Sequence, residues 1–207
     1  MNATPPDTLW IKICGLTTPE AVEAALAAGA DAIGFVFAES VRCVDTSAAC
    51  RLAGPARGKV PCVAVTRHPE QPQVDEIIAG FRPDILQSDA QDLERLALPR
   101  ELERLPVLRA WQAGQTLPRR LLFEGAVSGA GRACDWQVAA AAAQQAQLVL
   151  AGGLDPENVA GAIAAVRPFG VDVSSGVESR PGIKDPEAVM RFVAAARAAR
   201  PASLEQR

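Results

Sequence analysis

The sequence predicts an α/β fold, a single-domain (β/α)₈ TIM barrel, over residues 8–199, with residues 1–7 and 200–207 as tails. Short apolar runs alternate along the chain with Ala- and Leu-rich amphipathic stretches, and this alternation indicates βαβ units. The apolar runs are continuous, which is typical of parallel strands buried on both faces. There are eight such runs in 207 residues, and that length suits one compact barrel.

The eight apolar runs are the expected strands. They are Leu9–Cys14, Ala32–Phe37, Val60–Val65, Asp84–Leu86, Val107–Trp111, Leu121–Glu124, Leu148–Ala151 and Gly170–Val173. The clearest helical patterns between and after them are Pro19–Ala28, Asp75–Phe81, Asp155–Val166 and Pro186–Ala199. The fifth unit lacks a good helix, because Gln112–Arg120 is short and contains proline and glycine.

Three helix starts share one pattern, in which a capping side chain is followed by proline and then by an acid. They are Thr18-Pro19-Glu20, Asp155-Pro156-Glu157 and Asp185-Pro186-Glu187. The cap accepts N–H groups of the first turn, proline suits the first helical position, and the acid complements the helix dipole. An open doubly wound sheet is the alternative architecture, but it usually has a Gly-rich turn after its first strand. The residues there, Cys14-Gly15-Leu16-Thr17, are no dinucleotide fingerprint.

Composition and charge argue against several classes of partner. The formal net charge is −3, from 21 basic and 24 acidic residues without a Lys/Arg cluster, so we expect no nucleic acid partner. No apolar run approaches the roughly 20 residues that span a bilayer, and no segment resembles a signal peptide. The five cysteines are odd in number and lack CxxC spacing, which argues against a disulfide framework or a zinc site. We therefore expect a cytoplasmic protein without membrane contact and without a metal site.

Candidate functional residues follow the expected strands, because the active sites of such barrels lie at the C-terminal strand ends. Cys14 could act as a base through its thiolate, or could be a small buried apolar residue. Arg42 could hold a carboxylate with its fork, or could be a solvated loop residue. Glu124 could donate a proton, or could be a capping or loop acid. Gly131 lies in a run of small residues where the backbone could approach a ligand or simply turn.

Two glycine-bearing turns form the strongest local signal. Gly152 and Gly153 follow the seventh expected strand, and Ser175 and Gly176 follow the eighth. In barrels of this kind, the loops after strands seven and eight bind phosphate through backbone N–H groups. The turns therefore predict a phosphate-binding site. His68 is the only histidine, and we expect it in a surface loop and not in a Ser-His-Asp triad.

The motifs, taken in order, resemble those of phosphoribosylanthranilate isomerases. They are Lys12-Ile13-Cys14-Gly15-Leu16-Thr17, Gly34-Phe35-Val36-Phe37 with Arg42, Gly129-Ala130-Gly131 with Asp135-Trp136, Ala151-Gly152-Gly153-Leu154, and Gly170–Glu178 followed by Pro181-Gly182 and Lys184-Asp185. The resemblance covers residues 10 to about 196. It implies a TIM barrel that acts as an isomerase in L-tryptophan biosynthesis.

Carried over by position, the resemblance implies a role for each candidate. Cys14 would be the general base, Arg42 would bind the anthranilate carboxylate, and Asp172 would lie close to the ribose. The family's general acid is an aspartate at the end of strand six, and Glu124 stands at that position. The phosphate would be bound by Gly152, Gly153, Ser175 and Gly176.

The implied reaction is an Amadori rearrangement of N-(5′-phosphoribosyl)anthranilate to 1-(2-carboxyphenylamino)-1-deoxyribulose 5-phosphate. The acid protonates the furanose ring oxygen, the ring opens to a Schiff base, and the base removes the C2′ proton. The protonated imine is the electron sink, so no metal or organic cofactor is expected. The family also implies a small phosphorylated substrate as partner, and a monomer or homodimer.

The sequence departs from the family pattern at several positions. Glu124 replaces the aspartate, Asp89 stands where the family has a histidine, and Ser40-Val41-Arg42-Cys43 replaces Ser-Pro-Arg-Tyr. A divergent paralogue that acts on, or only binds, another phosphorylated ligand is therefore the alternative function. The related histidine-pathway isomerase is disfavoured because Cys14 takes the place of its strand-one acid. The indole-forming barrel is disfavoured because Gly34–Phe37 contains no lysine.

Overall fold

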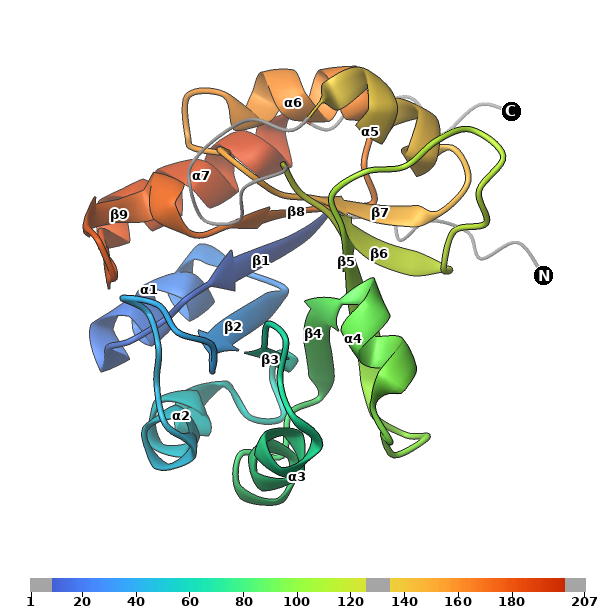
Figure 1. Ribbon diagram of the computed structural model, residues 1–207. Helices are drawn as coiled ribbons and strands as arrows, with labels where there is room; N and C mark the ends of the chain where they lie inside the picture. The colour runs from blue at the N-terminus through green and yellow to red at the C-terminus, as the bar shows by residue number, and fades with distance from the viewer. Residues whose placement is uncertain (1–8, 126–134, 200–207) are drawn as a thin grey trace.

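The computed structural model describes residues 9–125 and 135–199. Within them, strands β1 to β8 run parallel and close into a barrel in chain order (Figure 1). Helices pack around the outside of this barrel, with α5, α6 and α7 along one side and α2 and α3 along another. The fold class predicted from the sequence is confirmed.

The barrel strands are short, as the sequence predicted. They are β1 (Trp10–Cys14), β2 (Ala32–Val36), β3 (Cys62–Val65), β4 (Ile85–Asp89), β5 (Glu103–Leu108), β6 (Arg120–Phe123), β7 (Gln147–Leu150) and β8 (Gly170–Val173). After β8, the short strands β9 (Glu178–Arg180) and β10 (Ile183–Lys184) form a separate antiparallel pair.

Helices alternate with the strands except between β5 and β6, where the described residues contain none. They are α1 (Pro19–Ala28), α2 (Thr46–Ala53), α3 (Gln71–Gly80), α4 (Ala90–Arg95), α5 (Trp136–Ala143), α6 (Val159–Val166) and α7 (Pro186–Ala198), with the 3-10 turns η1 (Gly54–Ala56) and η2 (Ser175–Val177). No helix in the described part of the chain is long and apolar enough to cross a membrane.

The fifth strand is the main error in the predicted bounds. We expected Val107–Trp111, but β5 comprises Glu103–Leu108 and pairs with β4 from its first residue. Glu103 and Arg104 are exposed and polar, so the start of this strand lacks the apolar residues that predict a buried strand. Trp111 is buried beyond the strand, where its indole N–H donates to the Gln115 carbonyl at 3.0 Å. Residues 109–119 contain no helix, as the short Pro/Gly-bearing segment predicted.

Two of the three predicted helix starts are confirmed. The Thr18 side chain accepts the Ala21 N–H at the start of α1, and the Asp185 carboxylate accepts the Glu187 N–H at the start of α7. The third helix begins later than expected, at Val159, because Asp155 closes a separate turn before it.

Alternation along each strand divides the core into two layers. Leu121 and Phe123 pack with the surrounding helices, whereas Leu122 points into the barrel with residues such as Leu105 and Val149. The strands are therefore buried on both faces, which explains their continuous apolar sequences. On β1, Ile11 and Ile13 belong to the outer layer. Lys12 and Cys14 consequently face inward.

Candidate active site

Lys12, Cys14 and Asp172 form a buried cluster inside the barrel at the junction of β1 and β8. Lys12 is fully buried, and its Nζ lies 2.9 Å from Asp172 Oδ1. Lys12 and Asp172 are register partners on the two strands. Gly34 on β2 leaves room for the cluster, because a Cβ there would lie 3.0 Å from Cys14 Sγ and from Lys12 Cε. The cluster places one thiol beside a buried ion pair.

The charges around Cys14 oppose the effect of its burial. Burial raises the pKa of the Cys14 thiol, Lys12 and Lys184 act to lower it, and Asp172 raises it further. The net shift is upward, so the resting side chain is a thiol. Burial also lowers the pKa of Lys12, but Asp172 and Cys14 outweigh it and hold that pKa above its ordinary value. A permanent ammonium group therefore lies next to the thiolate that deprotonation of Cys14 creates.

Arg42 lies in the loop after β2 and binds Glu178, the first residue of β9, with its fork. Its Nε and Nη2 donate to the two carboxylate oxygens of Glu178 at 2.6 and 2.9 Å. Gly15 allows Arg42 to pass over the end of β1, since a Cβ at Gly15 would lie 2.6 Å from Arg42 Cδ. The contact with Glu178 uses the guanidinium edge formed by Nε and Nη2 and does not involve Nη1.

Glu178 is a buried carboxylate with several donors. Besides Arg42, it accepts from Lys184 Nζ at 2.8 Å and from the Gly182 N–H at 3.1 Å. Lys184 Nζ also donates to the Ser174 carbonyl at 3.0 Å. Burial alone would raise the pKa of Glu178, but Arg42, Lys184 and the Gly182 N–H outweigh it and hold the pKa below its ordinary value. Glu178 thus joins the loop after β2 to the segment after β8.

The two predicted phosphate-binding turns lie against each other. Gly152 and Gly153 have φ of +90° and +69°, a conformation that favours glycine. A Cβ on Gly176 would lie 1.9 Å from the Leu154 carbonyl oxygen, so Gly176 is required by the close approach of the turns. Ser175 and Gly176 belong to η2. The structure therefore brings the four predicted residues together at the C-terminal end of the barrel, where backbone N–H groups can bind an anion.

Glu124 lies directly after β6 and is mostly buried. Its Oε1 is 2.8 Å from Nη2 of Arg109, a residue that directly follows β5. Arg109 also binds Asp89 at the end of β4 through Nη1. Nearby on the inward face of β4, Gln87 has a buried Oε1 with no hydrogen-bond partner among the residues described. Glu124 therefore belongs to a charged group at the same end of the barrel as Cys14.

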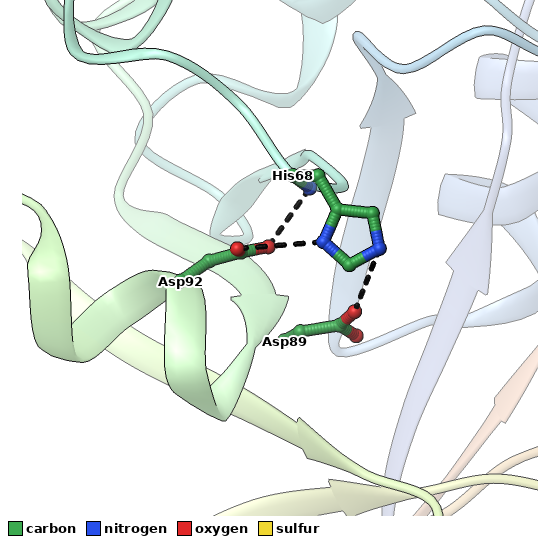
Figure 2. Close-up of side chains that lie close together, drawn as sticks. All are labelled: His68, Asp89 and Asp92. Carbon is green, nitrogen blue, oxygen red and sulfur yellow. Dashed lines mark hydrogen bonds and ion pairs between the residues drawn. The ribbon is translucent and has the colours of Figure 1, made fainter.

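His68 lies in the loop after β3 with an exposed side chain, as the sequence predicted. Figure 2 shows its ring between Asp92 and Asp89, with Nδ1 3.5 Å from Asp92 and Nε2 3.8 Å from Asp89. The three side chains are close enough to hold a cation. Both carboxylates already have arginine partners, however, Arg95 for Asp92 and Arg109 for Asp89. We therefore assign the group to ion pairing and not to metal binding.

Sequence reasoning missed several residues of this site. Lys12 and Arg109 lie at inward positions, two residues before Cys14 and two after Val107, and strand alternation is a signal that could have found them. Glu178 and Lys184 carried no such signal, because β9 and β10 were not expected. Gly131, the remaining predicted substrate contact, lies outside the described residues.

Comparison with known proteins gives one consistent result. The family model described as N-(5'phosphoribosyl)anthranilate (PRA) isomerase matches residues 11–195. The N-(5'-phosphoribosyl)anthranilate isomerase of Azorhizobium caulinodans is 39% identical over an alignment of 217 positions, gaps included, which covers 95% of each chain.

Two solved structures illustrate the structural similarity. One is that of monomers derived from the dimeric phosphoribosylanthranilate isomerase of Thermotoga maritima; its TM-score is 0.76 at 28% identity, and the match covers 92% of this chain and 99% of that one. The other is a phosphoribosylanthranilate isomerase in complex with reduced 1-(o-carboxyphenylamino)-1-deoxyribulose 5-phosphate; its TM-score is 0.72 at 27% identity, with coverage of 92% and 99%.

Proposed function

The chain belongs to the N-(5'-phosphoribosyl)anthranilate isomerase family of tryptophan biosynthesis, and we propose that Cys14 and Glu124 are the base and the acid of its reaction. The enzyme rearranges N-(5′-phosphoribosyl)anthranilate to 1-(2-carboxyphenylamino)-1-deoxyribulose 5-phosphate. The observation that supports the residue roles best is the meeting of Cys14, Glu124 and the Gly152 and Gly176 turns at one end of the barrel.

In the first step, Glu124 donates a proton to the furanose ring oxygen. The bond between C1′ and this oxygen breaks, its electron pair stays on the oxygen, and the nitrogen lone pair forms the protonated imine. The Glu124 carboxylate that results faces the Arg109 guanidinium 2.8 Å away. An ion pair with Arg109 stabilises this product of the proton transfer.

In the second step, Cys14 first loses its thiol proton to solvent, and the resulting thiolate removes the proton from C2′. The electrons of that C–H bond form the C1′–C2′ double bond, and the C=N electrons return to nitrogen to give the enolamine. Tautomerisation then gives the ketone at C2′. Lys12 supports the thiolate electrostatically, and it also holds Asp172, which we place near the ribose hydroxyl groups.

Substrate binding uses both ends of the ligand. The turns that contain Gly152, Gly153, Ser175 and Gly176 bind the phosphate through backbone N–H groups. Arg42 binds the anthranilate carboxylate with the edge not used by Glu178. With the phosphate bound by the turns and the carboxylate bound by Arg42, C1′ and C2′ of the substrate would lie between Cys14 and Glu124.

The first test is a direct isomerase assay that follows the loss of substrate fluorescence. We expect wild-type protein to turn over phosphoribosylanthranilate and Cys14→Ala to be slower by about 10²–10⁴. Cys50→Ala is the matched control, because Cys50 is an exposed cysteine on α2. A Cys14→Ala protein as active as this control would contradict the role of base.

Three further proposals concern the ligand alternative, the assembly and the location. Similarity along almost the whole chain favours the isomerase over a divergent paralogue with another phosphorylated ligand.

We propose a monomer or a homodimer, since the Thermotoga maritima relative is a dimer from which monomers were generated. We also propose a cytoplasmic location, which suits a biosynthetic enzyme and the free cysteines of the described residues.

A further inference from the structure

Three neighbouring strands end in charged side chains that face the barrel interior. Asp89 ends β4, Arg109 directly follows β5, and Glu124 directly follows β6. Each lies two residues beyond an inward-facing position of its own strand, Gln87, Val107 or Leu122. The register pair Val107↔Leu122 sets Arg109 opposite Glu124. The fold therefore places one cation between two carboxylates.

The contacts of Arg109 use both of its terminal nitrogens. Nη2 lies 2.8 Å from Glu124 Oε1, and Nη1 donates to Asp89 Oδ1. The three side chains are 26%, 13% and 15% exposed for Arg109, Glu124 and Asp89. Because the guanidinium group is planar and rigid, fixing one nitrogen on Asp89 also fixes the direction of the other. Glu124 is thereby held from the neighbouring strand.

The carboxylate of Asp89 also lies close to the loop after β3. His68 Nε2 lies 3.8 Å from Asp89 Oδ2 (Figure 2). The His68 backbone N–H donates to Asp92 at 2.8 Å, and the Ser88 hydroxyl donates to the same carboxylate at 3.0 Å. A continuous set of polar contacts therefore runs from the loop after β3 to the end of β6.

We propose that Arg109 is a positioning residue that orients the Glu124 carboxyl group toward the ring oxygen of the substrate, with Asp89 as its anchor. This inference rests on the proposed role of Glu124 as acid. Glutamate has three rotatable side-chain bonds, so a contact that fixes its carboxyl group reduces the number of positions that the group samples. Since a displacement of about 1 Å can cost on the order of 10²-fold in rate, a fixed carboxyl group has a direct effect on turnover.

Charge supports the same inference. Burial lowers the pKa of Arg109, but Asp89 and Glu124 outweigh it and hold the pKa above its ordinary value, so the guanidinium group stays charged. When Glu124 is protonated, Arg109 and Asp89 neutralise each other. When Glu124 has given up its proton, its carboxylate forms an ion pair with Arg109. Asp89 thus keeps Arg109 in place in both states.

The test combines variants of Arg109 with a variant of the acid. We expect Arg109→Met to lower kcat roughly 10- to 100-fold with a KM within about threefold of wild type, and Arg109→Lys to recover part of kcat. In a Glu124→Gln background, Arg109→Met should change kcat less than about threefold, because its effect passes through Glu124. Arg120→Met is the matched control: Arg120 also joins strands, through Glu103 and Gln147, but at the N-terminal end of the barrel.

Each outcome decides between the proposals. Equal losses from Arg109→Met in the wild-type and in the Glu124→Gln background would overturn the positioning role and indicate a structural one. A large rise in KM with unchanged kcat would overturn it in favour of direct substrate binding. An unchanged rate for Glu124→Gln alone would overturn the acid assignment, and the positioning role with it. Circular dichroism and thermal unfolding identify folded variants, and Asp89→Asn, which removes the charge of the anchor but keeps an oxygen that can accept from Arg109, should give a smaller loss of the same kind.

Discussion

At the scale of single residues, the buried pair Lys12–Asp172 sets the environment of Cys14. A buried ion pair adds little net stability, but removing one partner leaves an uncompensated charge. The pair lies directly beneath the proposed base, and its lysine carries a pKa above the ordinary value. Conversely, the site keeps its thiol neutral at rest because burial dominates. Among the side chains around Cys14, Lys12 acts most strongly to lower the pKa of the thiol.

Replacing Lys12 tests this directly. Lys12→Met should destabilise the protein by about 3–5 kcal/mol, since it leaves Asp172 buried without its partner. It should also raise the pKa of Cys14, because Lys12 acts to lower that pKa in the native protein. The measurement is the pH dependence of iodoacetamide alkylation at Cys14, followed by mass spectrometry. Exposed Cys43 and Cys50 serve as internal controls whose alkylation should not change.

At the scale of elements, the turns after β7 and β8 form one interlocked unit. The Gly176 position sits against the Leu154 carbonyl, and the Asn158 amide donates to the Gly153 carbonyl at 2.8 Å. The predicted glycine turns were placed correctly because turn residues and strand ends are local features of the sequence. Their contact with each other is not local, since it depends on β7 and β8 being neighbours in the barrel.

Adding one methyl group to this unit should weaken phosphate binding. Gly176→Ala would force the turns apart, at a cost of about 1–3 kcal/mol, and should raise KM for the substrate more than it lowers kcat. Gly161→Ala is the control, because a Cβ at Gly161 on α6 meets no atom within 4 Å. We expect that control to be neutral or to stabilise the helix by roughly 0.5–1 kcal/mol. Unchanged KM in Gly176→Ala would argue against the phosphate site.

At the scale of the whole molecule, Glu178 connects segments that are distant in sequence. It binds Arg42 across 136 residues and Lys184 in the adjacent hairpin. Its folded pKa is below the ordinary value, whereas in the unfolded chain it returns to about 4.3. A depressed folded pKa contributes stability above the unfolded pKa, and that stability is lost as pH falls through the folded pKa.

The stability of the protein should accordingly fall on acidification below about pH 4–5. Glu178→Gln should make the free energy of unfolding less dependent on pH in that range, because the titrating group is gone. Urea denaturation between pH 3 and pH 7, roughly, measures this dependence. Exposed Glu157→Gln, in a turn before α6, is the control and should leave the slope unchanged. Parallel slopes for wild type and Glu178→Gln would rule out a contribution from this carboxylate.

The barrel, most strand bounds and the positions of the glycine turns followed from the sequence, because apolar periodicity and glycine positions act over a few residues. The candidate residues Cys14 and Glu124 could be placed at strand ends for the same reason, whereas β5 was misplaced because its polar start resembles a loop. Only the tertiary structure decided which charges meet. Lys12 and Asp172 are 160 residues apart, and they become partners because barrel closure sets β8 beside β1. Arg109 joins Asp89 and Glu124 for the same physical reason: parallel strands bring their ends together, whatever their separation in the chain.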